Sequence, residues 1–299
     1  MNANSGEVFR NLLVCPLCKG RLNYNIRQIE CSCCAQKYPQ RREDCWDLLP
    51  RHLLRRGPID WERRQLEMEQ WYDDLISIPV RASSCLANDY DPYASILKTY
   101  TGLVLDVGGG AGIPRHYLPT DVHYVVVDPS LDWLGSGWTS IAPHFPCLQT
   151  RPSFVRGIGE YLPFADRSFD SSLAFWSLNH ADEPKRVVHE VGRVLKPGGR
   201  FLAVLEDMEP TWTDLFDKSL RTLGKRHLGR TLIKKLQFLF LRRPWPLQRD
   251  HIRIRESDLR SWSAPCLEKT WRGWIGNFLT LEFRKIGPTA KSEQADTPW

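Results

Sequence analysis

A short apolar run that ends in an acid and a glycine-rich loop constrains this chain most. Residues 103–107 read Leu-Val-Leu-Asp-Val, and residues 108–112 read Gly-Gly-Gly-Ala-Gly. Glycines at 108, 110 and 112 allow the backbone to turn sharply and to approach a ligand closely. The pattern therefore predicts a strand, a ligand-binding loop and then a helix.

The rest of residues 99–287 alternates apolar runs with helical segments. Further strands are predicted at 124–128, 172–176, 200–205 and 278–283, and a helix is predicted at 184–195. That helix begins at a proline, and Lys-Pro-Gly-Gly at 196–199 ends it. Strands that alternate with helices indicate an α/β fold with an open, doubly wound, mostly parallel sheet.

The composition excludes several classes of protein. The 299 residues are 42% hydrophobic and 25% charged, as in ordinary globular proteins and unlike mainly disordered chains. No stretch approaches the roughly 20 apolar residues of a membrane span. Residues 1–10 lack the apolar region of a secretory signal, so a cytoplasmic protein is expected.

Six of the nine cysteines fall within the first 45 residues. Cys15 with Cys18 and Cys31 with Cys34 form two C-x2-C pairs, which suit a tetrahedral zinc site. Cys33 is an alternative ligand to Cys34. Disulfides, or a ribbon without metal, are the other interpretations, but a tight cluster in a chain without a signal favours metal. Four thiolates leave no open coordination position, so the zinc would be structural.

Composition and pattern divide the chain into segments. We expect a zinc ribbon at residues 8–50, a helical connector at 51–98 and the main domain at 99–287. A disordered tail is expected at 288–299. The ribbon and the main domain are expected to have separate hydrophobic cores.

The main domain is expected to carry a basic helical insertion at about 208–262. Residues 218–255 contain twelve Lys and Arg and one acid, Asp250, although the whole chain carries only +6. Leucines and phenylalanines are interleaved with the charges. The segment is interpreted either as a helical lid whose charges face water, or as a surface for an anionic acceptor, RNA or an acidic membrane.

Four motifs in order resemble one family. They are Asp-x-Gly-x-Gly-x-Gly at 106–112, the strand ending in Asp128, the segment 157–170 and the helix-to-strand turn 190–199. Together they resemble the S-adenosylmethionine-dependent methyltransferases of the Rossmann-like class, type 11-like. The residues 15–50 resemble the short zinc ribbons fused to, or partnering, methyltransferases. The resemblance implies a seven-stranded sheet and S-adenosylmethionine as cofactor.

The resemblance also implies roles for residues. The loop would hold the methionine end of the cofactor, Asp128 would hold the ribose, and the segment at 160–161 would lie near the adenine. Ile158 stands where the family usually carries an Asp that contacts the adenine amino group. The predicted cofactor-binding residues are Asp106, Gly108, Gly110, Gly112, Asp128, Glu160 and Tyr161.

Methyl transfer is an in-line displacement for which the protein mainly supplies alignment. A general base is needed when the acceptor is a hydroxyl or a protonated amine. His180, which follows a strand at the expected cofactor edge, and His251, in the basic segment, are the candidate catalytic residues. Asn179, Glu206 and Asp207 follow strands at the same edge.

We therefore expect an enzyme that transfers a methyl group to a small or lipid-like, possibly anionic acceptor. An RNA base methyltransferase that docks RNA on the ribbon and the basic segment is the alternative. A non-catalytic module that binds S-adenosylmethionine is a third interpretation. A peripheral membrane contact is compatible with the first.

Overall fold

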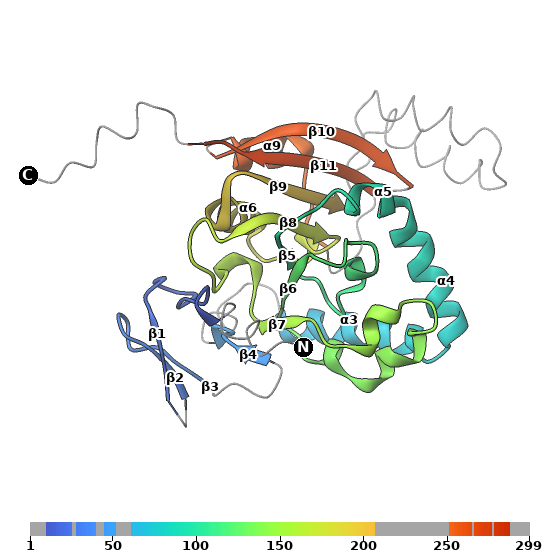
Figure 1. Ribbon diagram of the computed structural model, residues 1–299, viewed down its shortest axis with the longest axis horizontal. Helices are drawn as coiled ribbons and strands as arrows, with labels where there is room; N and C mark the ends of the chain where they lie inside the picture. Colours follow the sequence, from blue (N-terminus) through green and yellow to red (C-terminus); the bar gives the residue numbers. More distant parts are fainter. Residues whose placement is uncertain are drawn as a thin grey trace, which may run out of the picture.

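The computed structural model describes residues 10–25, 28–39, 45–51, 61–206, 251–264, 266–276 and 278–287. A large sheet forms the centre, and a small three-stranded sheet lies beside it (Figure 1). No helix in these ranges is long and apolar enough to cross a membrane. Most of the expected basic insertion, and the tail at 288–299, lie outside the described residues.

The large sheet has eight strands in the order β10-β11-β9-β8-β5-β6-β7-β4. All neighbours pair in parallel except β9 with β11 and β11 with β10, so the sheet is mostly parallel, as predicted. The bounds are β4 Cys45–Asp47, β5 Leu103–Val107, β6 His123–Asp128, β7 Ser153–Arg156, β8 Phe169–Phe175, β9 Leu195–Leu205, β10 Leu267–Ile275 and β11 Phe278–Lys285. Five of these strands, β5, β6, β8, β9 and β11, were predicted by position; the resemblance implies seven strands, and the sheet has eight.

Each central strand is buried on both faces, because successive side chains point to opposite sides. In β5, Val104 belongs to one core cluster, and Leu105 and Val107 belong to the other. In β6, Val126 and Val127 divide in the same way. Helices therefore have to cover both faces, which gives the layered α/β architecture.

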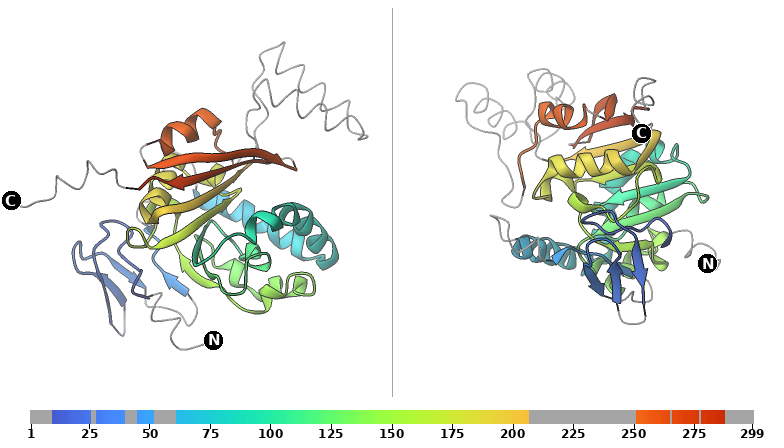
Figure 2. Two further views of the ribbon diagram at one scale, coloured as in Figure 1. Left: turned by 45° about the horizontal axis from the view of Figure 1, so that its top comes forward. Right: turned by 90° about the vertical axis from the view of Figure 1, so that its left-hand side faces the viewer.

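The helices are α3 Trp61–Ile76, α4 Pro79–Tyr90, α5 Ala94–Leu97, α6 Pro184–Val194 and α9 Glu256–Ser263. The helix α6 begins at a proline and buries its valines against one face, as its period predicts. The right-hand view of Figure 2 shows α6 and α9 on the same side of the sheet. In Figure 1, α4 lies to the right of the arrowheads of β8 and β9, on the far side of the molecule from the small sheet.

The glycine loop leads into a short turn instead of the predicted helix. The segment Ile113–His116 forms a single 3-10 turn. Pro114 is tolerated at its start, but Pro119 follows five residues later and lacks the N–H that would extend a helix. The prediction of a helix after the loop is therefore wrong.

The N-terminal segment does not form an independent unit. Its strands β1 Leu22–Tyr24, β2 Gln28–Cys31 and β3 Lys37–Pro39 make the small antiparallel sheet, but β4 pairs in parallel with β7. Leu13 pairs with Phe164, and one continuous apolar cluster contains residues of both sheets. The expectation of separate cores is wrong, because the apolar face of the small sheet is buried in the same cluster as one face of the large sheet.

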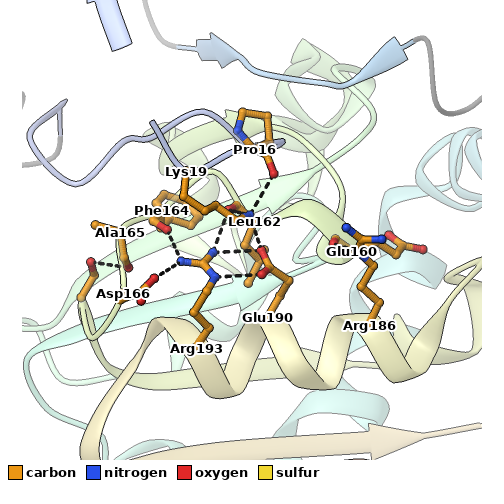
Figure 3. A network of polar contacts seen from close by, with 11 residues as sticks. Pro16, Lys19, Glu160, Leu162, Phe164, Ala165, Asp166, Arg186, Glu190 and Arg193 are labelled. Atoms are coloured by element: carbon orange, nitrogen blue, oxygen red, sulfur yellow. Dashed lines mark hydrogen bonds and ion pairs between the residues drawn. The ribbon is translucent and has the colours of Figure 1, made fainter. Parts of the chain in front are cut away.

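A polar network also joins the two parts, as Figure 3 shows. The ammonium of Lys19 donates to Glu190 Oε2 at 2.6 Å and to the carbonyls of Pro16 and Leu162 at 2.9 and 3.1 Å. Arg193 donates to both carboxylate oxygens of Glu190, at 2.8 and 2.9 Å. Although burial alone would raise the pKa of Glu190, the charges of Arg193 and Lys19 hold it below its usual value.

Replacing Lys19 tests whether its hydrogen bonds stabilise the packing of the N-terminal segment against the large sheet and α6. Lys19→Met removes three hydrogen bonds, one of them to a charged group, and should lower the free energy of unfolding by about 1–3 kcal/mol. Lys37→Met, in an exposed position on β3 of the same small sheet, is the matched control. Urea unfolding measures both, and equal stability of the two variants would contradict the proposed fastening.

Candidate functional site

A pocket of about 1010 Å³, including its open mouth, lies among the loops that follow the carboxyl ends of the parallel strands. Its walls come from residues 107–111 after β5, 127–129 after β6, 157–160 after β7 and 175–181 after β8. Residues of α3 and α4 contribute further walls, together with Ile113, Trp133, Trp138 and Val187. Ligands bind outside the carboxyl ends of the strands in open parallel sheets, so this is the candidate site.

The glycine loop forms the floor of the pocket. Gly108 and Gly110 have φ values of +66° and +52°, a region that side chains rarely adopt. A Cβ on Gly108 would lie 2.4 Å from the side chain of Ser177, and one on Gly109 would lie 2.7 Å from the carboxyl carbon of Asp106. The loop therefore needs glycine for its conformation and for its close packing. Gly112, at φ +76°, lies outside the pocket wall.

Asp106 lies beneath the loop and is completely buried. One carboxylate oxygen accepts a hydrogen bond from the Tyr124 hydroxyl, and the other has no partner among the described residues. Burial raises the pKa of Asp106 to about 7, in spite of the bond from Tyr124. An unpaired buried carboxylate favours a positively charged ligand nearby.

Asp128 ends β6 and borders the pocket. Its Oδ2 accepts from the N–H of Gly110 at 3.0 Å, and its Oδ1 accepts from the N–H of Ser130 at 3.0 Å and from the indole of Trp133 at 2.7 Å. A carboxylate offers about four acceptor positions, so capacity for another donor remains. Burial raises the pKa of Asp128 to about 6.

The segment after β7 reaches the pocket with two of its side chains. Ile158 and Glu160 line it, and Glu160 Oε1 accepts from the backbone N–H of Asp182 at 2.8 Å. Tyr161 is not part of the wall, and the Arg186 guanidinium lies 3.8 Å from the centre of its ring. The position of Tyr161 follows from the 3-10 turn Gly159–Tyr161, which directs neighbouring side chains to different sides.

Sequence reasoning missed the aromatic half of the pocket. This wall consists of Tyr72, Tyr90, Trp133, Trp138, Phe175 and Trp176, with Met68 and Leu86. Tyr72 contacts Trp133 edge-to-face at 4.7 Å, and Tyr90 contacts Trp176 in the same way at 4.9 Å. These residues follow no spacing motif, because they come from α3, α4, the connection between β6 and β7, and the end of β8.

The two candidate catalytic histidines meet at one end of the pocket. His180 lines the wall, and its ring packs edge-to-face on that of His251 with 4.6 Å between centroids. Glu206, directly after β9, places Oε2 3.2 Å from Nε2 of the buried His251. His180, Glu206 and His251 each place a metal-ligating atom within 4.8 Å of the other two.

The four predicted metal ligands also come together. Cys15, Cys18, Cys31 and Cys34 place their sulfurs within 4.8 Å of one another, with 3.7 Å between Cys15 and Cys34 and 3.4 Å between Cys18 and Cys31. Thiolates around a tetrahedral zinc ion at ~2.3 Å lie roughly 3.8 Å apart. The backbone N–H groups of Cys33 and Cys34 point at the sulfur of Cys31, which favours its thiolate. Cys33 lies outside the cluster, so the geometry selects Cys34.

Comparison with known proteins shows which proteins this chain is similar to. Residues 105–203 match the family model described as a methyltransferase domain. A demethylmenaquinone methyltransferase from Paenarthrobacter aurescens is 29% identical over 211 residues, which cover 65% of this chain and 77% of that protein. A protein of the same name from Renibacterium salmoninarum is 37% identical over 132 residues, covering 43% of this chain and about half (49%) of that protein.

Among solved structures, the YcgJ protein from Bacillus subtilis is similar to this chain. The TM-score is 0.45 at 20% sequence identity, and the match covers 67% of this chain and 100% of the other.

The buried carboxylates predict how the stability of the ligand-free protein depends on pH. The pKa of Asp106 is higher in the folded protein than in the unfolded chain, so the folded state holds this proton more tightly. Stability therefore falls as the pH rises from about 4 to about 7. Asp106→Asn should remove part of this slope and make the ligand-free protein more stable at pH 8, on the order of 1–4 kcal/mol.

The control is Asp121→Asn, an exposed residue near the amino end of β6. The free energy of unfolding is measured between pH 4.5 and 8 for the parent and both variants. If the free energy of unfolding of Asp106→Asn depends on pH as steeply as that of the parent, the raised pKa of Asp106 is contradicted.

The glycine loop, the buried acids and the match over residues 105–203 concern the same part of the chain. They lie on a sheet whose strand order and direction agree with the expected Rossmann-like fold. Residues 105–203 of the chain are therefore a methyltransferase domain on a Rossmann-like, mostly parallel sheet.

Proposed function

We propose that the pocket binds S-adenosylmethionine and a small, ring-bearing, apolar acceptor, and that the enzyme moves the methyl group between them. The observation that carries the proposal is the division of the pocket into two halves. One half is the glycine loop and Asp128, with Asp106 buried beneath the loop, and the other is an aromatic wall from α3, α4 and the segments after β6 and β8.

The residues present fit the cofactor. The unpaired carboxylate oxygen of Asp106 beneath the loop favours the positively charged methionine end. Exposed backbone at Gly108 and Gly110 allows close approach, and the remaining acceptor capacity of Asp128 suits a ribose hydroxyl. Glu160 and Tyr161 stay predicted neighbours of the adenine, with Ile158 supplying an apolar wall. Bound cofactor supplies a methyl group on a positively charged sulfur.

The aromatic wall supports the choice of acceptor. Aromatic rings that pack edge-to-face present further apolar faces and edges, against which another aromatic ring packs favourably. The buried indole N–H of Trp176 has no acceptor among the described residues, and an acceptor oxygen would satisfy it. Two relatives bear the name of a quinone methyltransferase, whose acceptor class has both a ring and oxygens.

The other interpretations have less support. An RNA base would have to enter a pocket walled by α3 and α4, and the basic segment that would bind the backbone lies mostly outside the described residues. A non-catalytic module would have no use for the histidines that border the pocket. Retention of nucleic acid by the purified protein at low salt, and its release at high salt, would favour the RNA alternative.

We also propose that the four cysteines bind one structural zinc ion. The sulfur separations support this, and the buried Tyr38 hydroxyl lies 3.2 Å from the sulfur of Cys15, where it donates to a thiolate. The cluster lies apart from the pocket, so the zinc supports the fold and takes no part in methyl transfer.

The cofactor proposal predicts a specific loss of affinity. Asp128→Ala removes an acceptor that serves the ribose and should weaken S-adenosylmethionine binding by about 1.5–3 kcal/mol, roughly tenfold to 150-fold. Asp121→Ala, near the opposite end of the same strand, should leave the affinity unchanged. Titration calorimetry measures both.

The same proteins are then assayed for methyl transfer with a reduced naphthoquinone and with a catechol as acceptors. Transfer to either by the parent supports the acceptor class. Undiminished affinity in Asp128→Ala would exclude the ribose assignment, whatever the assay of transfer shows.

The zinc proposal predicts a difference between neighbouring cysteines. Cys34→Ser should lose one zinc ion per chain and lower the stability of the whole protein, because the ribbon shares the core of the large sheet. Cys33→Ser, an exposed residue outside the cluster, should keep the ion. Elemental analysis decides, and zinc retained in Cys34→Ser but lost in Cys33→Ser would reverse the assignment.

A further inference from the structure

Three segments that are far apart in the sequence bring polar side chains to one end of the pocket. His180 ends the 3-10 turn Leu178–His180 after β8, Glu206 follows β9, and His251 precedes α9. The ligating atoms of all three lie within 4.8 Å of one another. His180 lines the pocket, and Glu206 and the buried His251 lie directly behind it.

One buried amide holds these three segments in place. Asn179 is completely buried, and its Oδ1 accepts the backbone N–H of Glu206 at 3.1 Å. Its Nδ2 donates to the carbonyl of Ile252 at 3.2 Å, and its own carbonyl accepts the N–H of Ile252 at 2.7 Å. Each bond fixes the backbone next to one member of the cluster, as the outer residues of metal sites do.

The distances suit a metal ion. Nitrogen and oxygen ligands lie ~2.1 Å from a divalent transition metal, so neighbouring ligands lie roughly 3.0–3.4 Å apart and opposite ones at most about 4.2 Å apart. The 3.2 Å between His251 Nε2 and Glu206 Oε2 falls in the first range. If two of the ligating atoms lie as far apart as 4.8 Å, a movement of only about 0.6 Å brings them to the largest separation that one ion can bridge.

We propose that His180, Glu206 and His251 bind one divalent transition-metal ion at the edge of the acceptor pocket. Two imidazoles and one carboxylate favour zinc, iron, cobalt or nickel over calcium and magnesium. Three protein ligands leave at least one coordination position open. Because His180 lines the pocket, this position is available to an oxygen of the acceptor.

The role in transfer rests on the proposed function, although metal binding does not. An acceptor hydroxyl bound to the ion gives up its proton to water at a lower pH. The resulting oxyanion forms the new O–CH₃ bond while the S–CH₃ bond breaks, and the positive sulfur becomes a neutral thioether. The ion would thus select an oxygen acceptor over a nitrogen acceptor.

The test counts metal ions per chain after equilibration with Co²⁺ and removal of free metal. We expect His180→Ala and Glu206→Gln each to hold one ion fewer than the parent protein. His189→Ala, an exposed histidine on α6, is the matched control and should hold the parent's number. His251→Ala tests the buried ligand if it folds, and the other two variants decide if it does not.

Equal cobalt content in the parent, His180→Ala and Glu206→Gln would overturn the site and leave an ion pair between Glu206 and His251. The four-cysteine cluster contributes equally to the number of metal ions in each protein, because it is intact in every variant. Calorimetry with S-adenosylmethionine on the same samples separates the two proposals. If the variants lose an ion but the parent protein binds no S-adenosylmethionine, the metal site stands and the proposed function is rejected.

Discussion

Parallel pairing of β5 with β6 and with β8 is the constraint on which the site depends. Parallel strands end at the same edge of a sheet, so the segments that follow them are neighbours in space. The glycine loop, Asp128 and the turn that carries His180 are separated by up to 72 positions in the sequence, yet all three border one pocket. The antiparallel strands β10 and β11 extend the sheet away from this edge.

The site combines buried charge with apolar walls, and the two features reinforce each other. Rings and valines around the pocket exclude water, which raises the pKa of Asp106 and Asp128. In such a low-dielectric site, the attraction between an ionised carboxylate and a positively charged ligand is stronger than in water. Burial of these carboxyl groups therefore lowers the free energy of unfolding of the ligand-free protein at neutral pH, at the position where the ligand is proposed to bind.

The N-terminal segment that carries the cysteines is part of the same domain. This segment supplies β4 to the edge of the large sheet, Leu13 to its core and Lys19 to the carboxylate of Glu190. Glu190 lies on α6, and Val187, one turn earlier on that helix, lines the pocket. Loss of the proposed zinc ion is thus expected to affect the whole domain, because apolar surface and a buried charge would be exposed together.

Local sequence determined the parts of this protein that depend on neighbouring residues. Glycine spacing predicted the loop at 108–112, since only glycine tolerates its φ values, and two C-x2-C pairs predicted the metal cluster. Period-two and period-3.6 patterns predicted α6 and five strands of the large sheet, but β4, β7 and β10 carried too weak a pattern.

The tertiary structure alone decided the rest. It placed β4 in the large sheet, formed the aromatic wall from α3, α4, the β6–β7 connection and the end of β8, and joined Glu206 and His251 beside His180. No local pattern encodes these contacts, because they arise when distant segments bury apolar surface together. The physical reason is that spacing along the chain reports local backbone geometry, whereas the composition of a pocket depends on which distant surfaces pack against each other.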